Sequence, residues 1–71
     1  MEEGRVECRA EYTYPQRPTA VWWAGQRVPV TAVETEWRTP EGLAFRVRCE
    51  DGKRFELFYL EGENRWLVNL L

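Results

Sequence analysis

The 71-residue chain contains no histidine and no serine, and Asp51 is its only aspartate. The nucleophile–base pairs that most covalent enzymes use are therefore not available. Cys8 and Cys49 match no zinc-ligand spacing, and the further ligands of a four-coordinate zinc site are missing. The five glycines are scattered, so no phosphate-binding loop is present. We expect a protein that is not an enzyme and that holds no metal and no cofactor.

The chain also lacks a long apolar run, and it does not start with a basic stretch followed by an apolar one. Neither a membrane span nor a secretion signal is predicted, and the cytoplasm is the expected location. The net charge of −2 gives no general attraction to nucleic acid or to anionic lipid. Cys8 and Cys49 are interpreted either as buried thiols, which behave as small apolar side chains, or as a cross-strand disulfide.

Aromatic side chains are abundant: four tryptophans, three tyrosines and three phenylalanines. A domain of this length buries only about 60% of the surface that its unfolded chain exposes. Each buried ring removes roughly 150–250 Å² from water, so the aromatics compensate for the small size. We expect one domain over residues 1–71, with the rings as the frame of its core.

Apolar residues alternate with polar ones in short runs that proline and glycine interrupt, without helical periodicity. This pattern predicts an all-β domain of about six short antiparallel strands. Six strands in so short a chain form either a strongly bent sheet or a small SH3-like, partly open barrel. The first strand is expected over residues 6–13. The last, RWLVNLL, turns Trp66, Val68 and Leu70 inward.

Trp22 and Trp23 are adjacent, so on a strand they point to opposite faces of the sheet. A type II′ turn at Gly25–Gln26 pairs Trp23 with Val28 and places both on one apolar face. Trp23 is therefore the expected core tryptophan, and Trp22 belongs to the second face.

The strand after this turn changes phase along its length. Val28 and Val33 lie in opposite phases, and Trp37 shares the phase of Val33. A β-bulge near Thr31–Ala32 reconciles the two phases by adding one residue and bending the strand. The turn RTPEG, residues 38–42, ends it.

The segment LAFRVRCEDGKRFELFYL is interpreted as a second hairpin. A two-residue loop would pair apolar with polar residues across the strands. A three-residue loop, Glu50–Asp51–Gly52 with its glycine left-handed, pairs Val47 with Phe55 instead. It also sets Arg46 against Glu56 as a cross-strand ion pair. We predict the three-residue loop.

Three segments carry a recognisable pattern: RPTAVWWAG, FRVRCEDGKRFELFY and RWLV. They contain Arg-Pro, an apolar residue and Trp before a Gly, then Phe-Arg-Val, an aspartate–glycine turn and a final Trp. In this pattern the chain resembles a family of short bacterial proteins of unknown function, over about residues 14–70. The resemblance implies a small all-β domain and no activity. Trp23 takes the family's tryptophan position, which leaves Trp22 as a feature of this chain.

Five large apolar side chains fall on the strand phase opposite to the core: Trp22, Phe58, Leu60, Leu67 and Leu71. Contiguous apolar patches mark interaction sites. The set therefore predicts association with a second copy, with a different protein or with a ligand. The alternative is that the curl of the sheet, the termini or the loops cover these side chains.

A second functional hypothesis is weak binding of single-stranded nucleic acid. Tyr14, Arg17, Trp22 and Arg27 lie around two turns, and they would form a corner where bases stack beside cations. Glutamates on the same face balance the arginines, and the prolines nearby give Tyr14 and Trp22 an ordinary packing role. We therefore rank protein–protein association first.

Overall fold

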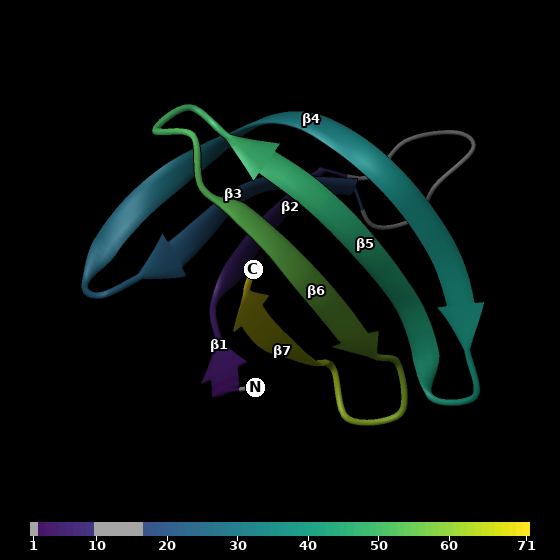
Figure 1. Cartoon of the computed structure of the whole chain (residues 1–71). Helices are drawn as coiled ribbons and strands as arrows, with labels where there is room; N and C mark the ends of the chain where they lie inside the picture. Colours follow the sequence, from purple (N-terminus) through teal and green to yellow (C-terminus); the bar gives the residue numbers. More distant parts are fainter. Residues whose placement is uncertain (1, 10–16) are drawn as a thin grey trace.

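Seven β-strands make up most of the described part of the chain, residues 2–9 and 17–71 of a computed structural model. They are β1 (Glu2–Gly4), β2 (Val6–Arg9), β3 (Arg17–Trp23), β4 (Gln26–Thr39), β5 (Gly42–Cys49), β6 (Arg54–Leu60) and β7 (Arg65–Leu70). One antiparallel sheet in the order β1-β7-β6-β5-β4-β3-β2 curls strongly into an open half-barrel (Figure 1). The predicted all-β class is confirmed. The predicted first strand begins at Val6 as expected, as β2, and its continuation past Arg9 lies outside the described residues; β1, which precedes it, was not predicted.

Residues 2–9 supply the two edge strands of the sheet, β1 and β2. β1 lies against β7, β2 lies against β3, and between them the Arg5 carbonyl oxygen accepts a hydrogen bond from the Trp22 amide at 2.9 Å. β1 can approach β7 closely because Gly4 has no side chain. A Cβ atom at position 4 would lie 2.7 Å from Val68 Cγ2. In these two described ranges no helix has the length and apolar character that a membrane span needs.

Strand β4 bends so far that it serves two parts of the sheet, since it pairs first with β3 and then with β5 (Figure 1). Its register against β5 shifts between Val30 and Ala32, which confirms the predicted bulge. A second shift, between Val33 and Thr35, is not predicted by the sequence pattern. The second added residue reverses the phase again. Val33 therefore packs on the core while Trp37 faces outward, and the expectation that the two share a face is wrong.

The β5–β6 hairpin has the predicted register, with Val47 opposite Phe55. The Cys49 amide donates to the Lys53 carbonyl oxygen at 2.8 Å and closes the three-residue loop. Gly52 has a φ of 88°, the left-handed conformation that such a loop requires at its last position.

The β3–β4 hairpin differs from the prediction at its turn. The central residues are Ala24 and Gly25, one position earlier than predicted, and both have positive φ (51° and 77°), as a type I′ turn requires. Val28 is consequently opposite Val21 and not Trp23. The partner changes by two residues, so every side chain stays on its predicted face, because side chains alternate with a period of two.

The concave side of the sheet holds the core, formed by Val21, Val28, Phe45, Val47, Cys49, Phe55, Leu57, Trp66 and Val68. Trp23 faces this core from its margin, where its partly buried ring meets the Phe55 ring edge-on at 5.5 Å. The buried tryptophan is Trp66, which is 8% exposed. Leu70 lies on the predicted inner face, opposite the core residue Phe55, but it is 40% exposed, since β1 pairs with β7 only from Trp66 to Val68.

Both cysteines are free thiols, so the disulfide alternative is wrong in this structure. Cys49 is buried, and Cys8 is partly buried against the core. Burial raises the pKa of each thiol to about 11. Thiols with so high a pKa are poor nucleophiles at neutral pH.

Candidate interaction surface

An apolar row crosses the outer, convex side of the sheet over four neighbouring strands. Trp37 on β4 is opposite Ala44 on β5, Ala44 is opposite Phe58 on β6, and Phe58 is opposite Leu67 on β7. Ala44 is small and fully buried, and across it the rings of Trp37 and Phe58 meet edge-to-face at 6.2 Å. Leu60 lies two residues beyond Phe58 on the same side of β6. We call Trp37, Phe58, Leu60 and Leu67, all partly exposed, the outer apolar strip.

The outer apolar strip has no second layer over it in the part of the chain that the structure describes. All seven strands belong to one curled sheet, and the curl encloses the core on the concave side (Figure 1). The alternative interpretation, in which the curl of the sheet covers the side chains of the second face, is therefore only partly correct. The curl buries the inward phase, while the strip keeps contact with solvent.

Ion pairs of balanced sign flank the strip. Next to it on β5 and β6, Arg46 Nη2 donates to Glu56 Oε2 at 2.7 Å, the cross-strand pair predicted from the sequence. Further along, Glu34 at the second bulge of β4 bonds Arg54 at 2.8 Å and contacts Arg48 at 3.4 Å. The hydrogen bond from Arg54 lowers the pKa of the Glu34 carboxyl group. These contacts partly neutralise the charges of Arg46, Arg48 and Arg54.

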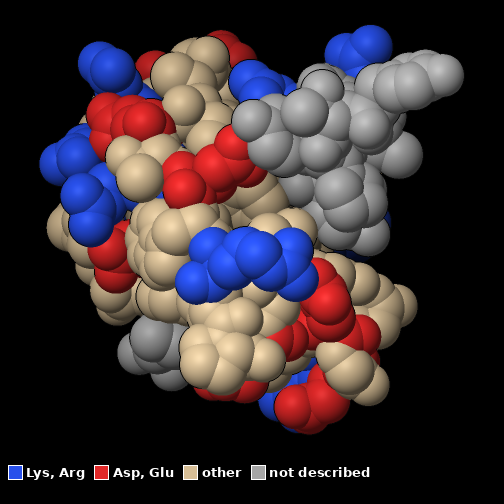
Figure 2. Space-filling view, turned by 90° about the vertical axis from the view of Figure 1, so that its right-hand side faces the viewer, with Lys and Arg blue, Asp and Glu red and all other residues tan. Residues whose placement is uncertain are grey.

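The charge pattern is mixed on a larger scale too. Figure 2 shows the side of the molecule that lies on the right in Figure 1, and there acidic and basic side chains are interspersed with uncharged surface. At the far end of the sheet, Arg65 bonds both Glu3 at 3.0 Å and Glu63 at 2.6 Å. A dedicated nucleic-acid surface would instead show a basic stripe.

The structure brings together three of the five side chains predicted for the interaction surface: Phe58, Leu60 and Leu67. Trp22 lies apart from them on β3, which β4 and β5 separate from β6 in the sheet order. Leu71 follows the end of β7, is 53% exposed, and stands about 13 Å along the strand direction from Leu67. Trp37, which the sequence pattern assigned to the core side, takes their place.

Trp22 instead fastens the N-terminal segment to the sheet. Its Nε1 donates to Glu7 Oε2 at 3.0 Å, and Arg27 Nε donates to the same oxygen at 2.9 Å. Arg5 places its guanidinium 4.9 Å above the indole ring. The hydrogen bonds from Arg27 and from Trp22 lower the pKa of the Glu7 carboxyl group. The tryptophan of the predicted nucleic-acid corner is therefore already held by contacts within the chain.

Arg17, another predicted member of that corner, lies away from Trp22. Arg17 begins β3, five residues earlier and on the order of 16 Å away along the strand, opposite Arg9. Tyr14 lies outside the described residues. Of the three members that the structure describes, Trp22 and Arg27 lie together and Arg17 lies apart.

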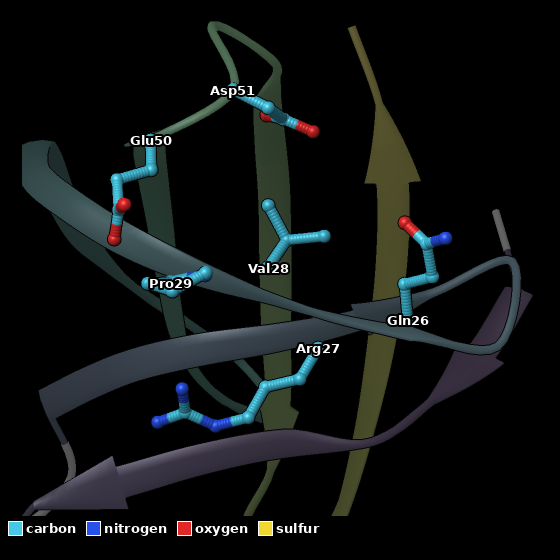
Figure 3. A pocket seen from close by; sticks show the side chains of 6 residues that line it. All are labelled: Gln26, Arg27, Val28, Pro29, Glu50 and Asp51. Carbon is cyan, nitrogen blue, oxygen red and sulfur yellow. The ribbon is translucent and has the colours of Figure 1, made fainter.

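An open hollow of about 300 Å³ lies between β4 and the β5–β6 loop (Figure 3). Gln26 and Val28 reach into it from β4, Glu50 and Asp51 form its rim, and the Arg27 side chain extends away from it on the other side of the strand. Asp51 already accepts from Lys53 Nζ at 2.7 Å, which lowers the pKa of its carboxyl group. These lining residues include no nucleophile–base pair.

The described residues contain no cluster of three side chains that could hold a metal ion. The chain matches no protein-family model, no curated protein and no solved structure. The resemblance to short bacterial proteins of unknown function therefore remains a hypothesis.

Proposed function

We propose that the protein is a small, non-enzymatic module of the cytoplasm that associates with a protein surface through the outer apolar strip. The observation that carries this proposal is the position of Trp37 and Phe58. The two rings are paired on the convex side of the sheet and are partly exposed, and no second strand layer of the described residues lies over them. A contiguous apolar patch in such a position is typical of an interaction site.

The strip also has the anatomy of an interface. Tryptophan and other aromatic residues dominate the binding energy of protein interfaces, and polar groups form the rim around them. Here Trp37 and Phe58 form the centre, and the Arg46–Glu56 pair lies beside them. The edge-to-face contact holds both rings in place before binding, so little side-chain freedom is lost on association.

Nucleic-acid binding is less well supported. One face of the Trp22 ring is covered by Arg5, and Glu7 stands between Trp22 and Arg27. A base that stacked there would have to displace these contacts. The balanced charges of the outer face provide no electrostatic attraction to phosphates.

The proposal is tested by placing a carboxylate within the strip. Leu67→Glu brings an unpaired charge into the interface, and we expect it to weaken association by at least about 100-fold. Leu71→Glu is the matched control, because it makes the same exchange at an exposed leucine outside the strip. Association is measured by sedimentation velocity of the purified chain, and circular dichroism verifies that both variants fold. Equal effects of the two exchanges would contradict the proposal.

A further inference from the structure

The outer face of the sheet is organised symmetrically about the line between β5 and β6. Trp37 lies one strand outside this line on β4, and Leu67 lies one strand outside it on β7. A second copy that is turned by 180° about this line and laid on the face places β5 on β6, and Trp37 on Leu67. Such an isologous contact needs a surface that is complementary to itself.

The charges next to the strip meet this requirement. Arg46 on β5 and Glu56 on β6 are direct cross-strand partners, so the rotation lays each of them over the opposite charge of the second copy. Within the described residues, Arg46 donates to a side chain only from Nη2, and Glu56 accepts only at Oε2. Nη1 and Oε1 remain for the second copy, which gives four charges of alternating sign.

Two further observations support the arrangement. Arg46 Nε is buried without an acceptor in the monomer, so part of the desolvation of this guanidinium has already taken place before association. In the same row across the sheet, Thr35 on β4 is opposite Arg46, and Asn69 on β7 is opposite Glu56. The rotation lays Thr35 of one copy over Asn69 of the other.

One pair of like charges limits the contact. The rotation also lays Arg48 over Arg54 at the end of the face. In each copy Glu34 contacts both of these arginines, so their charge is partly neutralised. This end therefore forms the edge of the contact.

The size of the face places the contact among small interfaces. Four strands at about 4.8 Å spacing and three outward rows about 6.8 Å apart cover roughly 19 by 20 Å. A standard interface buries about 800 Å² per partner, a large share of a molecule with 4585 Å² of accessible surface. The available face is smaller and convex, which favours a weak, reversible dimer.

From the self-complementary charges and this area, we infer that the partner of the outer apolar strip is a second copy of the chain, related by a two-fold axis parallel to β5 and β6. This inference rests on the proposed function and specifies its partner.

Charge reversal tests the arrangement, with the mass measured by light scattering after size-exclusion chromatography at concentrations from about 5 to 500 µM. The wild type is expected to approach 17 kDa, twice its 8.5 kDa. Arg46→Glu and Glu56→Arg each bring like charges together and should remain monomeric. Mixed in equal amounts, the two variants present opposite charges to each other and should regain the dimer mass. The matched control is the Arg38–Glu61 pair, because Arg38 lies on the core side of the sheet, opposite Leu43, and Arg38→Glu should leave the dimer unchanged.

The outcomes separate this inference from the proposed function. A wild type that stays monomeric at the highest concentration overturns self-association and leaves the strip for a different protein. A wild-type dimer that Leu67→Glu abolishes, together with a mixture that stays monomeric, overturns the two-fold arrangement alone. A dimer that survives both Leu67→Glu and Arg46→Glu overturns the inference and the proposed function together.

Discussion

The close approach of β1 to β7 predicts that a single methyl group at position 4 destabilises the fold. In Gly4→Ala the new Cβ atom would lie 2.7 Å from Val68 Cγ2 and 3.3 Å from Val68 Cβ. Val68 is 1% exposed and packs within the core, so it has little room to move. Overpacking of this kind costs about 1–3 kcal/mol. For a domain of this size, that is a large part of a total stability of roughly 4–10 kcal/mol.

Urea unfolding followed by tryptophan fluorescence measures this loss, and Trp66, directly opposite Gly4, reports on the site. Gly62→Ala is the control, because no atom lies within 4 Å of its added Cβ. Val68→Ala removes the methyl groups that collide. The loss in free energy of unfolding of the double variant should therefore be about 1 kcal/mol smaller than the sum of the losses of the two single variants. A loss below about 0.5 kcal/mol in Gly4→Ala, or strict additivity with Val68→Ala, would refute the close contact.

Two further predictions concern the core. Trp66→Ala should lower the free energy of unfolding by about 3–5 kcal/mol, because the ring is buried and contacts those of Phe45 and Tyr59, at 5.9 and 4.9 Å. Trp23→Ala should lower it by less, since that ring is only partly buried, and the reverse order in urea unfolding would be inconsistent with the structure. Both thiols should react slowly with Ellman's reagent at pH 8 in the native state. A pKa raised from 9.0 to about 11 leaves roughly 100-fold less thiolate at that pH, and reactivity should rise as the pH approaches 11. A thiol that reacts at pH 8 as fast as one in the denatured chain would contradict the burial of Cys8 or Cys49.

The β5–β6 hairpin was predictable in detail because two independent constraints agree on it. The alternation fixes which residues share a face, and the aspartate–glycine pair limits the loop to a few lengths. Only the three-residue loop sets Val47 against Phe55 and Arg46 against Glu56, and the structure has this pairing.

The β3–β4 turn could not be fixed in the same way. A glycine that occupies the first turn position of a type II′ turn occupies the second position of a type I′ turn when the turn begins one residue earlier. Both choices leave Val21, Trp23 and Val28 on one face, so hydrophobic alternation does not distinguish them. The difference lies in the conformation of Ala24, which adopts a positive φ that alanine seldom takes.

The position of Trp37 shows where alternation along one strand is insufficient. Counted from Val33, Trp37 belongs to the core phase, and the glutamates around it fit that interpretation. Counted from the turn at residues 38–42, the pairing of Thr39 with Gly42 sets Trp37 opposite Ala44, whose neighbour Phe45 is in the core. The two counts disagree by one residue, and a second bulge is the simplest way to satisfy both. A bulge that moves a tryptophan from the core to the outer face leaves a large apolar ring in contact with solvent. This exposure of the ring to water is unfavourable unless another apolar side chain covers it. The strip provides Phe58 for this and, in the proposed dimer, Leu67 of the second copy.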